Sequence, residues 1–160
     1  MSETEAPPMP PLAVNLQYVK DLSFEVPGAP AIYANLRGQP QVAINLDVQV
    51  KLVEEAASVF EVTLSIRAEA SEAPADEYSK PRNVFLAELA YAGLFTLNGI
   101  APADVEPILL IECPRLLFPF ARNILADITR ESGFPPVMLQ PIDFVALWHA
   151  RRNAEQIGHA

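Results

Sequence analysis

The sequence is poor in the residues that most enzymes use for chemistry. Its 160 residues include one cysteine, Cys113, and two histidines, His149 and His159. A single cysteine excludes an internal disulfide, and without a histidine or cysteine cluster a metal site is not expected. The chain carries no glycine-rich phosphate loop and no recognisable catalytic triad spacing. We therefore expect a non-enzyme with no catalytic residues, no metal and no cofactor, and we interpret Cys113 as a small buried hydrophobe rather than a nucleophile.

Positive charge is also scarce. Eleven lysines and arginines stand against 20 aspartates and glutamates, which gives a formal net charge of −9. Such a field repels phosphate backbones, so nucleic-acid binding is not expected, and it favours basic partners. No apolar run is long enough to span a bilayer, and the N-terminal residues 1–5 are acidic rather than basic. We expect a cytoplasmic protein without direct membrane insertion.

Apolar residues, by contrast, are abundant. They make up 51% of the chain, against 19% charged residues. This supports a folded core and leaves apolar surface for an oligomer or a groove. The composition predicts a disordered, acidic and proline-rich arm over residues 1–12, a single domain over 13–150 and a flexible tail over 151–160.

Alternation of apolar and polar residues predicts four β-strands. They fall within residues 14–26, 42–50, 60–67 and 84–97. In the first strand the even-numbered positions are apolar apart from one lysine, so that face is expected to be buried. The fourth strand is largely apolar on both faces, which is typical of an interior strand.

The connections predict the order of these strands. A short acidic link joins the second strand to the third, and a longer polar loop over residues 71–83, with two prolines, joins the third to the fourth. Residues 27–40 are too long for a tight hairpin. This favours an antiparallel sheet of order 1-4-3-2 with a Greek-key-like crossover. Beyond residue 100 the pattern becomes helical. Pro107 and Pro114 predict a short helix followed by a separate longer one, and a last helix is expected to begin near Asp143. Helices packed on one face of the sheet make this an α+β protein.

The face of the sheet away from the helices carries a candidate docking patch. Asp21 and Glu25 are four residues apart on one strand and so share a face. Leu86 and Glu88 share a face of the fourth strand, which lies beside the first in the predicted order. An apolar side chain beside three carboxylates on a flat sheet indicates a docking surface. The alternative is an acid–base pair formed by Asp21 and Glu25, which would require a deep pocket.

A second candidate site is an apolar groove between residues 27–40 and the last helix. The aromatic residues of the chain are first of all candidates for the core. A groove for unfolded chains must be apolar, long and unspecific, because its affinity comes from buried area. Its candidate walls are Tyr33, Leu36, Phe144 and Trp148.

Several segments in order resemble the SecB family of export chaperones. They read YVKDLSFEVPGAP at 18–30, FTLNGI at 95–100, CP at 113–114 followed by LFPFAR at 117–122, GFP at 133–135 and LQPIDFVAL at 139–147. The resemblance covers residues 16–148. It implies a homotetramer, built as a dimer of dimers, that keeps precursor proteins unfolded and passes them to the translocation ATPase SecA without using ATP itself.

The same resemblance implies a role for the docking patch. The ATPase-docking residues of the family match Asp21, Glu25, Leu86 and Glu88, the same four that strand alternation singles out. A SecB-like chaperone for a non-export client such as an antitoxin is the alternative within this fold. The patch favours export, because a dedicated antitoxin chaperone need not keep it.

Overall fold

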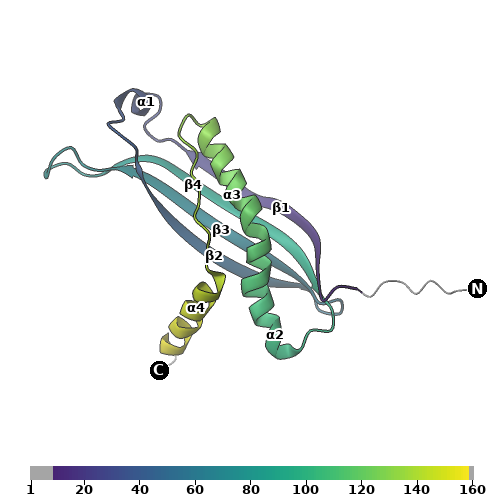
Figure 1. The fold of residues 1–160 in the computed structure, drawn as a ribbon. Helices are drawn as coiled ribbons and strands as arrows, with labels where there is room; N and C mark the ends of the chain where they lie inside the picture. Colours follow the sequence, from purple (N-terminus) through teal and green to yellow (C-terminus); the bar gives the residue numbers. More distant parts are fainter. Residues whose placement is uncertain (1–8, 159–160) are drawn as a thin grey trace, which may run out of the picture.

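Four antiparallel strands and a set of helices on one of their faces make up the fold (Figure 1). The computed structural model describes residues 9–158, so most of the predicted arm at 1–12 lies outside the described residues. The elements in chain order are β1 (Leu12–Glu25), α1 (Ala31–Asn35), β2 (Gln41–Glu54), β3 (Val59–Glu72), β4 (Arg82–Leu97), α2 (Pro102–Pro107), the π-helical η1 (Ile108–Glu112), α3 (Cys113–Glu131) and α4 (Phe144–Gly158).

The sheet has the order β1-β4-β3-β2, with every neighbouring pair antiparallel, which confirms the predicted topology and the α+β class. Residues 26–40, called the crossover from here on, connect the two edge strands and contain α1. None of the helices within residues 9–158 is long and apolar enough to cross a membrane.

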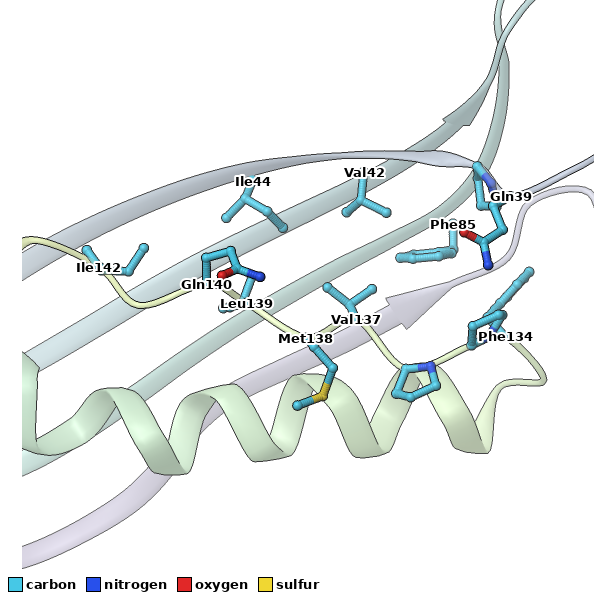
Figure 2. A pocket seen from close by; sticks show the side chains of 13 residues that line it. Gln39, Val42, Ile44, Phe85, Phe134, Val137, Met138, Leu139, Gln140 and Ile142 are labelled. Atoms are coloured by element: carbon cyan, nitrogen blue, oxygen red, sulfur yellow. The ribbon is translucent and has the colours of Figure 1, made fainter.

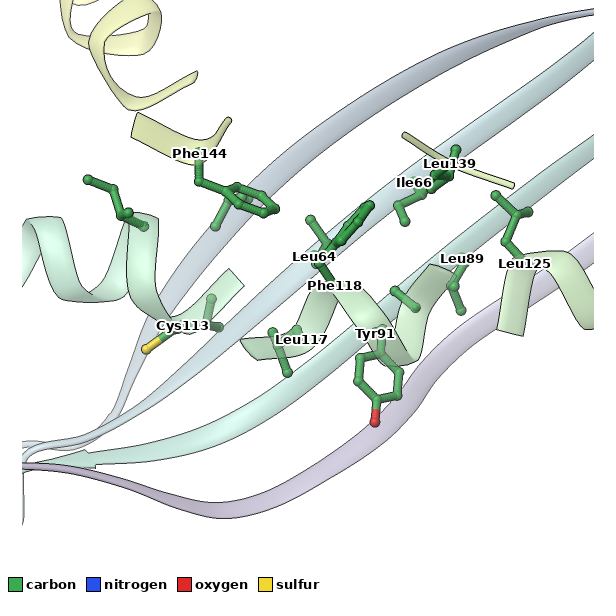
Figure 3. Packing of buried hydrophobic residues seen from close by; sticks show 14 of the residues in the cluster. Leu64, Ile66, Leu89, Tyr91, Cys113, Leu117, Phe118, Leu125, Leu139 and Phe144 are labelled. Carbon is green, nitrogen blue, oxygen red and sulfur yellow. The ribbon is translucent and has the colours of Figure 1, made fainter. Parts of the chain in front are cut away.

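The core lies between α3 and the two central strands. On β3 the predicted alternation is confirmed, because Val62, Leu64 and Ile66 are buried. They lie in one cluster with Leu117 and Leu125 of α3 (Figure 3). Apolar side chains at helical spacing form a stripe that fits the pleated face of the sheet. The opposite face of the sheet, on the side away from α3, is called the outer face below.

A glycine on β4 allows α3 to approach the sheet. A Cβ atom on Gly93 would lie 2.7 Å from the ring of Phe95 and 3.1 Å from Leu117 Cδ2. Both separations are shorter than ordinary carbon–carbon contacts, so a side chain at this position would push α3 away from the strand. Gly93 is therefore required by packing rather than by backbone conformation.

The predicted break between a short and a long helix is absent. Helical structure is continuous from Pro102 to Glu131, because η1 lies between Pro107 and Pro114. The backbone N–H of Cys113 donates to the carbonyl of Ile108, five residues back, which is the bond of a π-helical turn. Pro114 stands in the first turn of α3, directly after η1, so the residue without an N–H donor lies where the π-helical bonding gives way to α-helical bonding.

The alternation predicted for β1 is wrong for Leu16 and Tyr18. The register of β1 against β4 shifts between Val14 and Leu16 and again between Val19 and Asp21. Each bulge inserts one residue and moves the following side chains to the other face. Leu16 and Tyr18 therefore lie on the outer face, and the second bulge places Asp21 on the outer face as well.

Two local signals place the extended segment between α3 and α4. Gly133 has a φ of +89°, and the N–H groups of Gly133 and Phe134 donate to the carbonyls of Arg130 and Thr129. This is the glycine-terminated end that the sequence indicates for α3. Asp143 Oδ1 accepts the N–H of Ala146 at 3.0 Å and so caps α4. The residues between them, 134–143, are called the link.

α4 is longer than expected. It continues through residue 158, so residues 151–158 of the predicted tail are helical. Arg151 and Arg152 consequently lie within the helix, and its last turn carries no basic residue. Flexibility of residues 151–160 stays a prediction, and residues 159–160 lie outside the described residues.

Candidate functional site: a charged sheet face and an apolar groove

The register of β1 against β4 brings the predicted docking residues together. Glu25 lies opposite Leu86, and Ser23 lies opposite Glu88, two pairs further along. Ala87 and Leu89 belong to the core cluster, so Leu86 and Glu88 point to the outer face between them. Asp21 and Glu25 are exposed, and the side chain of Glu88 is 45% exposed.

β3 adds two charged residues that the sequence analysis did not assign to this patch. Arg67 lies opposite Glu88, with Nη1 of Arg67 3.4 Å from Oε1 of Glu88. Glu69 lies opposite Leu86, and its Oε2 is 3.8 Å from Arg67 Nη2. Alternation along β3 puts Arg67 and Glu69 on one face, and this pattern could have predicted that they belong to the patch. Asp21, Glu25, Glu69, Leu86 and Glu88 are called the acidic patch from here on.

The acidic patch keeps a surplus of negative charge. Four carboxylates face the one guanidinium of Arg67, so their net formal charge together is −3. Exposed ion pairs such as these contribute about 0–1 kcal/mol each, so the patch is not held together by them. Its charges are instead available to a partner of opposite sign.

The two carboxylates of the acid–base alternative do not converge on a common pocket. A hollow of about 290 Å³ opens on the outer face, lined by Asp21, Asp47, Arg67 and Glu88 among others, but not by Glu25. The arrangement fits a docking surface better than proton transfer, which needs aligned groups within hydrogen-bond reach of one substrate.

A hydrogen-bonded network ties β1 to β3 at the other end of the outer face. Glu61 accepts bonds from the Tyr18 hydroxyl and, at 2.6 Å, from Lys20 Nζ. Burial and the bond to Glu61 raise the pKa of Tyr18 to about 12. The bonds from Lys20 and Tyr18 lower the pKa of Glu61. The bulges in β1 create this network, so strict alternation did not predict it.

An apolar groove of about 520 Å³ lies between the link and the start of β2 (Figure 2). Val42 and Ile44 of β2 form one wall, and Val137, Leu139 and Ile142 of the link form the other. Further lining residues include Gln39, Pro40, Phe85, Phe134 and Met138. No charged side chain of the described residues lines it. β2 is an edge strand, so its outward backbone N–H and C=O groups are not paired in the sheet.

This groove differs from the predicted one because its second wall is the link, not the last helix. α3 ends at Glu131, and after Gly133 the chain returns over the sheet in extended form (Figure 1). Phe144 is 2% exposed and packs edge-on against Phe118, with ring centroids 6.0 Å apart, so it is a core residue. Trp148 stands on α4, where its Nε1 donates to Glu106 at 3.1 Å.

The two predicted walls in the crossover lie beside the end of α3. Tyr33 stacks on Phe134, with centroids 5.2 Å apart, and its hydroxyl donates to the carbonyl of Ser132 at 2.7 Å. Leu36 packs against a small buried cluster that includes Ile32 and Phe134. The four predicted residues therefore do not converge on one cavity, and their contact with a bound chain stays a prediction.

A second apolar surface runs along α3 and β1. Leu116 and Phe120 of α3 are exposed, and so are Val14, Val19 and Leu22 of β1. The three β1 residues pair opposite core-facing residues of β4, so they lie on the same side of the sheet as α3. Exposed apolar side chains gathered on one side of a sheet are typical of a surface that binds a partner or a second copy of the chain.

The described residues offer no cluster of three or more metal-ligating side chains within residues 9–158. Cys113 is fully buried, and burial together with the nearby Glu112 raises the pKa of its thiol to about 12. A thiol held protonated in the core is a poor nucleophile, which confirms its interpretation as a small hydrophobe.

Comparison with known proteins gives consistent matches. The SecB family model, described as preprotein translocase subunit SecB, matches residues 5–155. The chain is 68% identical over 147 residues to the protein-export protein SecB of Granulibacter bethesdensis, covering 92% of this chain and 85% of that protein. It is 63% identical over 169 residues to protein-export protein SecB of Acidiphilium cryptum, covering 100% of both.

A solved structure agrees in fold. A SecB-like chaperone from Mycobacterium tuberculosis, in complex with a peptide from an antitoxin, is similar with a TM-score of 0.63 and 16% sequence identity, covering 82% of this chain and 91% of that chain. The family match spans the whole sheet and the helices through α3, and it ends within α4. The chain belongs to the SecB family of protein-export chaperones.

Proposed function

We propose that this protein binds unfolded precursor polypeptides in the apolar groove, keeps them competent for export and delivers them to the ATPase SecA through the acidic patch. It acts in the cytoplasm as a homotetramer, a dimer of dimers, and needs no cofactor or catalytic group. The observation that carries the proposal is the placement of two distinct surfaces on opposite sides of one sheet, an apolar groove and an exposed acidic patch.

The groove suits extended chains of varied sequence. Its walls are apolar, and the outward edge of β2 beside Val42 and Ile44 can pair with the backbone of a bound segment. Burying about 200 Å² of apolar surface, roughly one large aromatic side chain, contributes about 5 kcal/mol before the cost of ordering the client. Affinity that comes from area and backbone pairing does not depend on one client sequence, as a general export chaperone requires.

The acidic patch suits a basic surface on the ATPase. Its carboxylates are exposed around Leu86, which can be buried at the centre of the contact. Complementary charge accelerates association and is screened by salt, so docking should weaken as ionic strength rises. Client binding in the uncharged groove should depend much less on salt.

The exposed apolar surface along α3 and β1 supports assembly of the homotetramer. Leu116 and Phe120 stand beside Val14, Val19 and Leu22 on one side of the sheet. Interfaces of stable oligomers are more apolar than the rest of the surface. Native mass measurement of the purified chain tests this part, and a monomer as the dominant species would refute it.

The test of the proposal is Glu88→Lys. Reversing this charge in the centre of the acidic patch should abolish SecA docking, measured by calorimetry, and leave the affinity for an unfolded precursor unchanged. Glu55→Lys is the matched control, since Glu55 is exposed in the turn between β2 and β3, away from the patch, and the charge change is the same. Glu55→Lys should dock normally.

Other outcomes separate the alternatives. Full SecA docking by Glu88→Lys would contradict the assigned patch. A wild-type chain that binds unfolded protein but never docks on SecA would favour a SecB-like chaperone for a non-export client such as an antitoxin. Loss of the tetramer or of client binding in Glu88→Lys would show that the residue has a structural role instead.

A further inference from the structure

A buried carboxylate joins the crossover to the loop end of the β3–β4 hairpin. Glu72 and Arg82 are the last opposed pair of these two strands, and they form an ion pair. The side chain of Glu72 is only 8% exposed, although it carries a charge. Arg37 of the crossover brings a second guanidinium, with its Nε 3.5 Å from Oε1 of Glu72. A buried charge normally needs such paired partners.

The contacts of this cluster reach the backbone of the crossover. Oε1 of Glu72 accepts the backbone N–H of Arg37 at 2.7 Å. Nη2 of Arg82 donates to the carbonyl of Asn35 at 2.9 Å, and Nη2 of Arg37 donates to the carbonyl of Ala73 at 3.3 Å. Since two of these bonds end on main-chain atoms of residues 35–37, the cluster fixes the path of the crossover and not merely a side chain.

The fixed segment leads directly into a wall of the groove. Gln39 and Pro40, which follow Arg37 by two and three residues, line the groove. Pairing of β2 with β3 begins at Gln41. Gly38 has open space around it and adds no packing of its own. Residues 38–40 are therefore positioned by β2 on one side and by the contacts of Glu72 on the other.

We propose that Glu72 is a positioning residue for client binding, which holds the crossover so that Gln39 and Pro40 form the mouth of the groove. This inference rests on the proposed chaperone function and deepens it. Each carboxylate oxygen of Glu72 has its own partner, the Arg37 amide for one and the Arg82 guanidinium for the other. A neutral amide can keep the first bond but leaves the two guanidinium groups without their counter-charge.

The ion pairs of Glu72 persist at neutral pH. The bond from the Arg37 backbone and the bond from Arg82 lower the pKa of Glu72 below its ordinary value. Glu72 thus stays ionised throughout the neutral range, and its role is to pre-organise the groove rather than to switch it.

The experiment compares Glu72→Gln with the wild type as full-length proteins. The apparent dissociation constant for a client rises in inverse proportion to the fraction of molecules with a competent groove. If that fraction falls to about one fifth, the affinity for a reduced, unfolded precursor weakens about fivefold. Hydrogen exchange of residues 31–40 should accelerate in the variant without any client present, because the Arg37 N–H loses its charged acceptor. Tetramer mass and SecA docking should not change.

The matched control is Glu69→Gln on the same strand. The side chain of Glu69 is partly exposed on the outer face, and its carboxylate forms an ion pair with Arg67. Glu69→Gln should leave client affinity and hydrogen exchange of residues 31–40 unchanged while weakening SecA docking. Glu72→Gln should show the reverse, with weaker client binding, faster exchange of residues 31–40 and normal SecA docking. This contrast would separate the two residues by function.

The outcomes that overturn the inference are distinct from failure of the proposed function. Client affinity equal to wild type in Glu72→Gln overturns the inference alone. So does faster exchange spread through β3 and β4, which would mean that Glu72 only stabilises the sheet. A wild-type chain that binds no unfolded precursor refutes the proposed function, and the positioning role falls with it.

Discussion

Replacing Ile44 by serine should weaken client binding without changing assembly. Ile44 is 36% exposed and forms part of the β2 wall of the groove (Figure 2). A client that covers the exposed part buries about 50 Å² of apolar surface on this side chain, which contributes about 1.3 kcal/mol at 25 cal/mol per Å². Loss of that contact corresponds to an increase of about tenfold in the dissociation constant.

Isothermal titration with a permanently unfolded precursor measures this change. Leu52→Ser is the matched control, since Leu52 is exposed on the same face of the same strand but lies outside the groove. Leu52→Ser should bind the client as the wild type does. Equal affinity of Ile44→Ser and wild type, with both proteins folded, would refute the assignment of the β2 wall to client binding.

Three further predictions follow from the packing and the charges. Gly93→Ala should destabilise the fold by about 1–3 kcal/mol in urea denaturation, because the new Cβ overlaps Phe95. An unchanged denaturation midpoint would contradict the close approach of α3. Tyr18 has a pKa raised to about 12, so its contribution to stability is complete below pH 10, the ordinary value, and is lost as pH rises toward 12. Tyr18→Phe should remove the tyrosine step near pH 12 from an ultraviolet pH titration, and an identical titration would count against the Glu61 bond. Phe120→Asp should shift the native mass toward smaller species, since Phe120 stands in the exposed apolar surface of α3, and an intact tetramer would exclude it from the interface.

The central sheet was predictable because its sequence pattern and its environment agree. β3 is flanked by two strands and covered by α3, so every second residue is buried and the alternation is read directly. The long crossover fixed the strand order, because only a non-adjacent pair of strands needs so long a connection. The position of Asp21, Glu25, Leu86 and Glu88 on one face followed from the same two facts, whereas Glu69 was not assigned to the patch.

Features that depend on local irregularity or on distant contacts were not predictable. The bulges of β1 shift Leu16 and Tyr18 to the outer face without any glycine or proline to announce them. The groove depends on the path of the link after Gly133. An extended segment can follow many paths over a sheet, so its sequence does not show that it forms the second wall. The contacts of Glu72 unite residues separated by 10 and 35 positions, and no periodicity connects them.

The most direct test is a hydrogen-exchange footprint of the protein with and without a bound unfolded precursor. We expect protection at residues 39–44 and 134–142, the two walls of the groove, and none at Leu86 or Glu88 on the outer face. Protection of the outer face with both groove walls unchanged would contradict it.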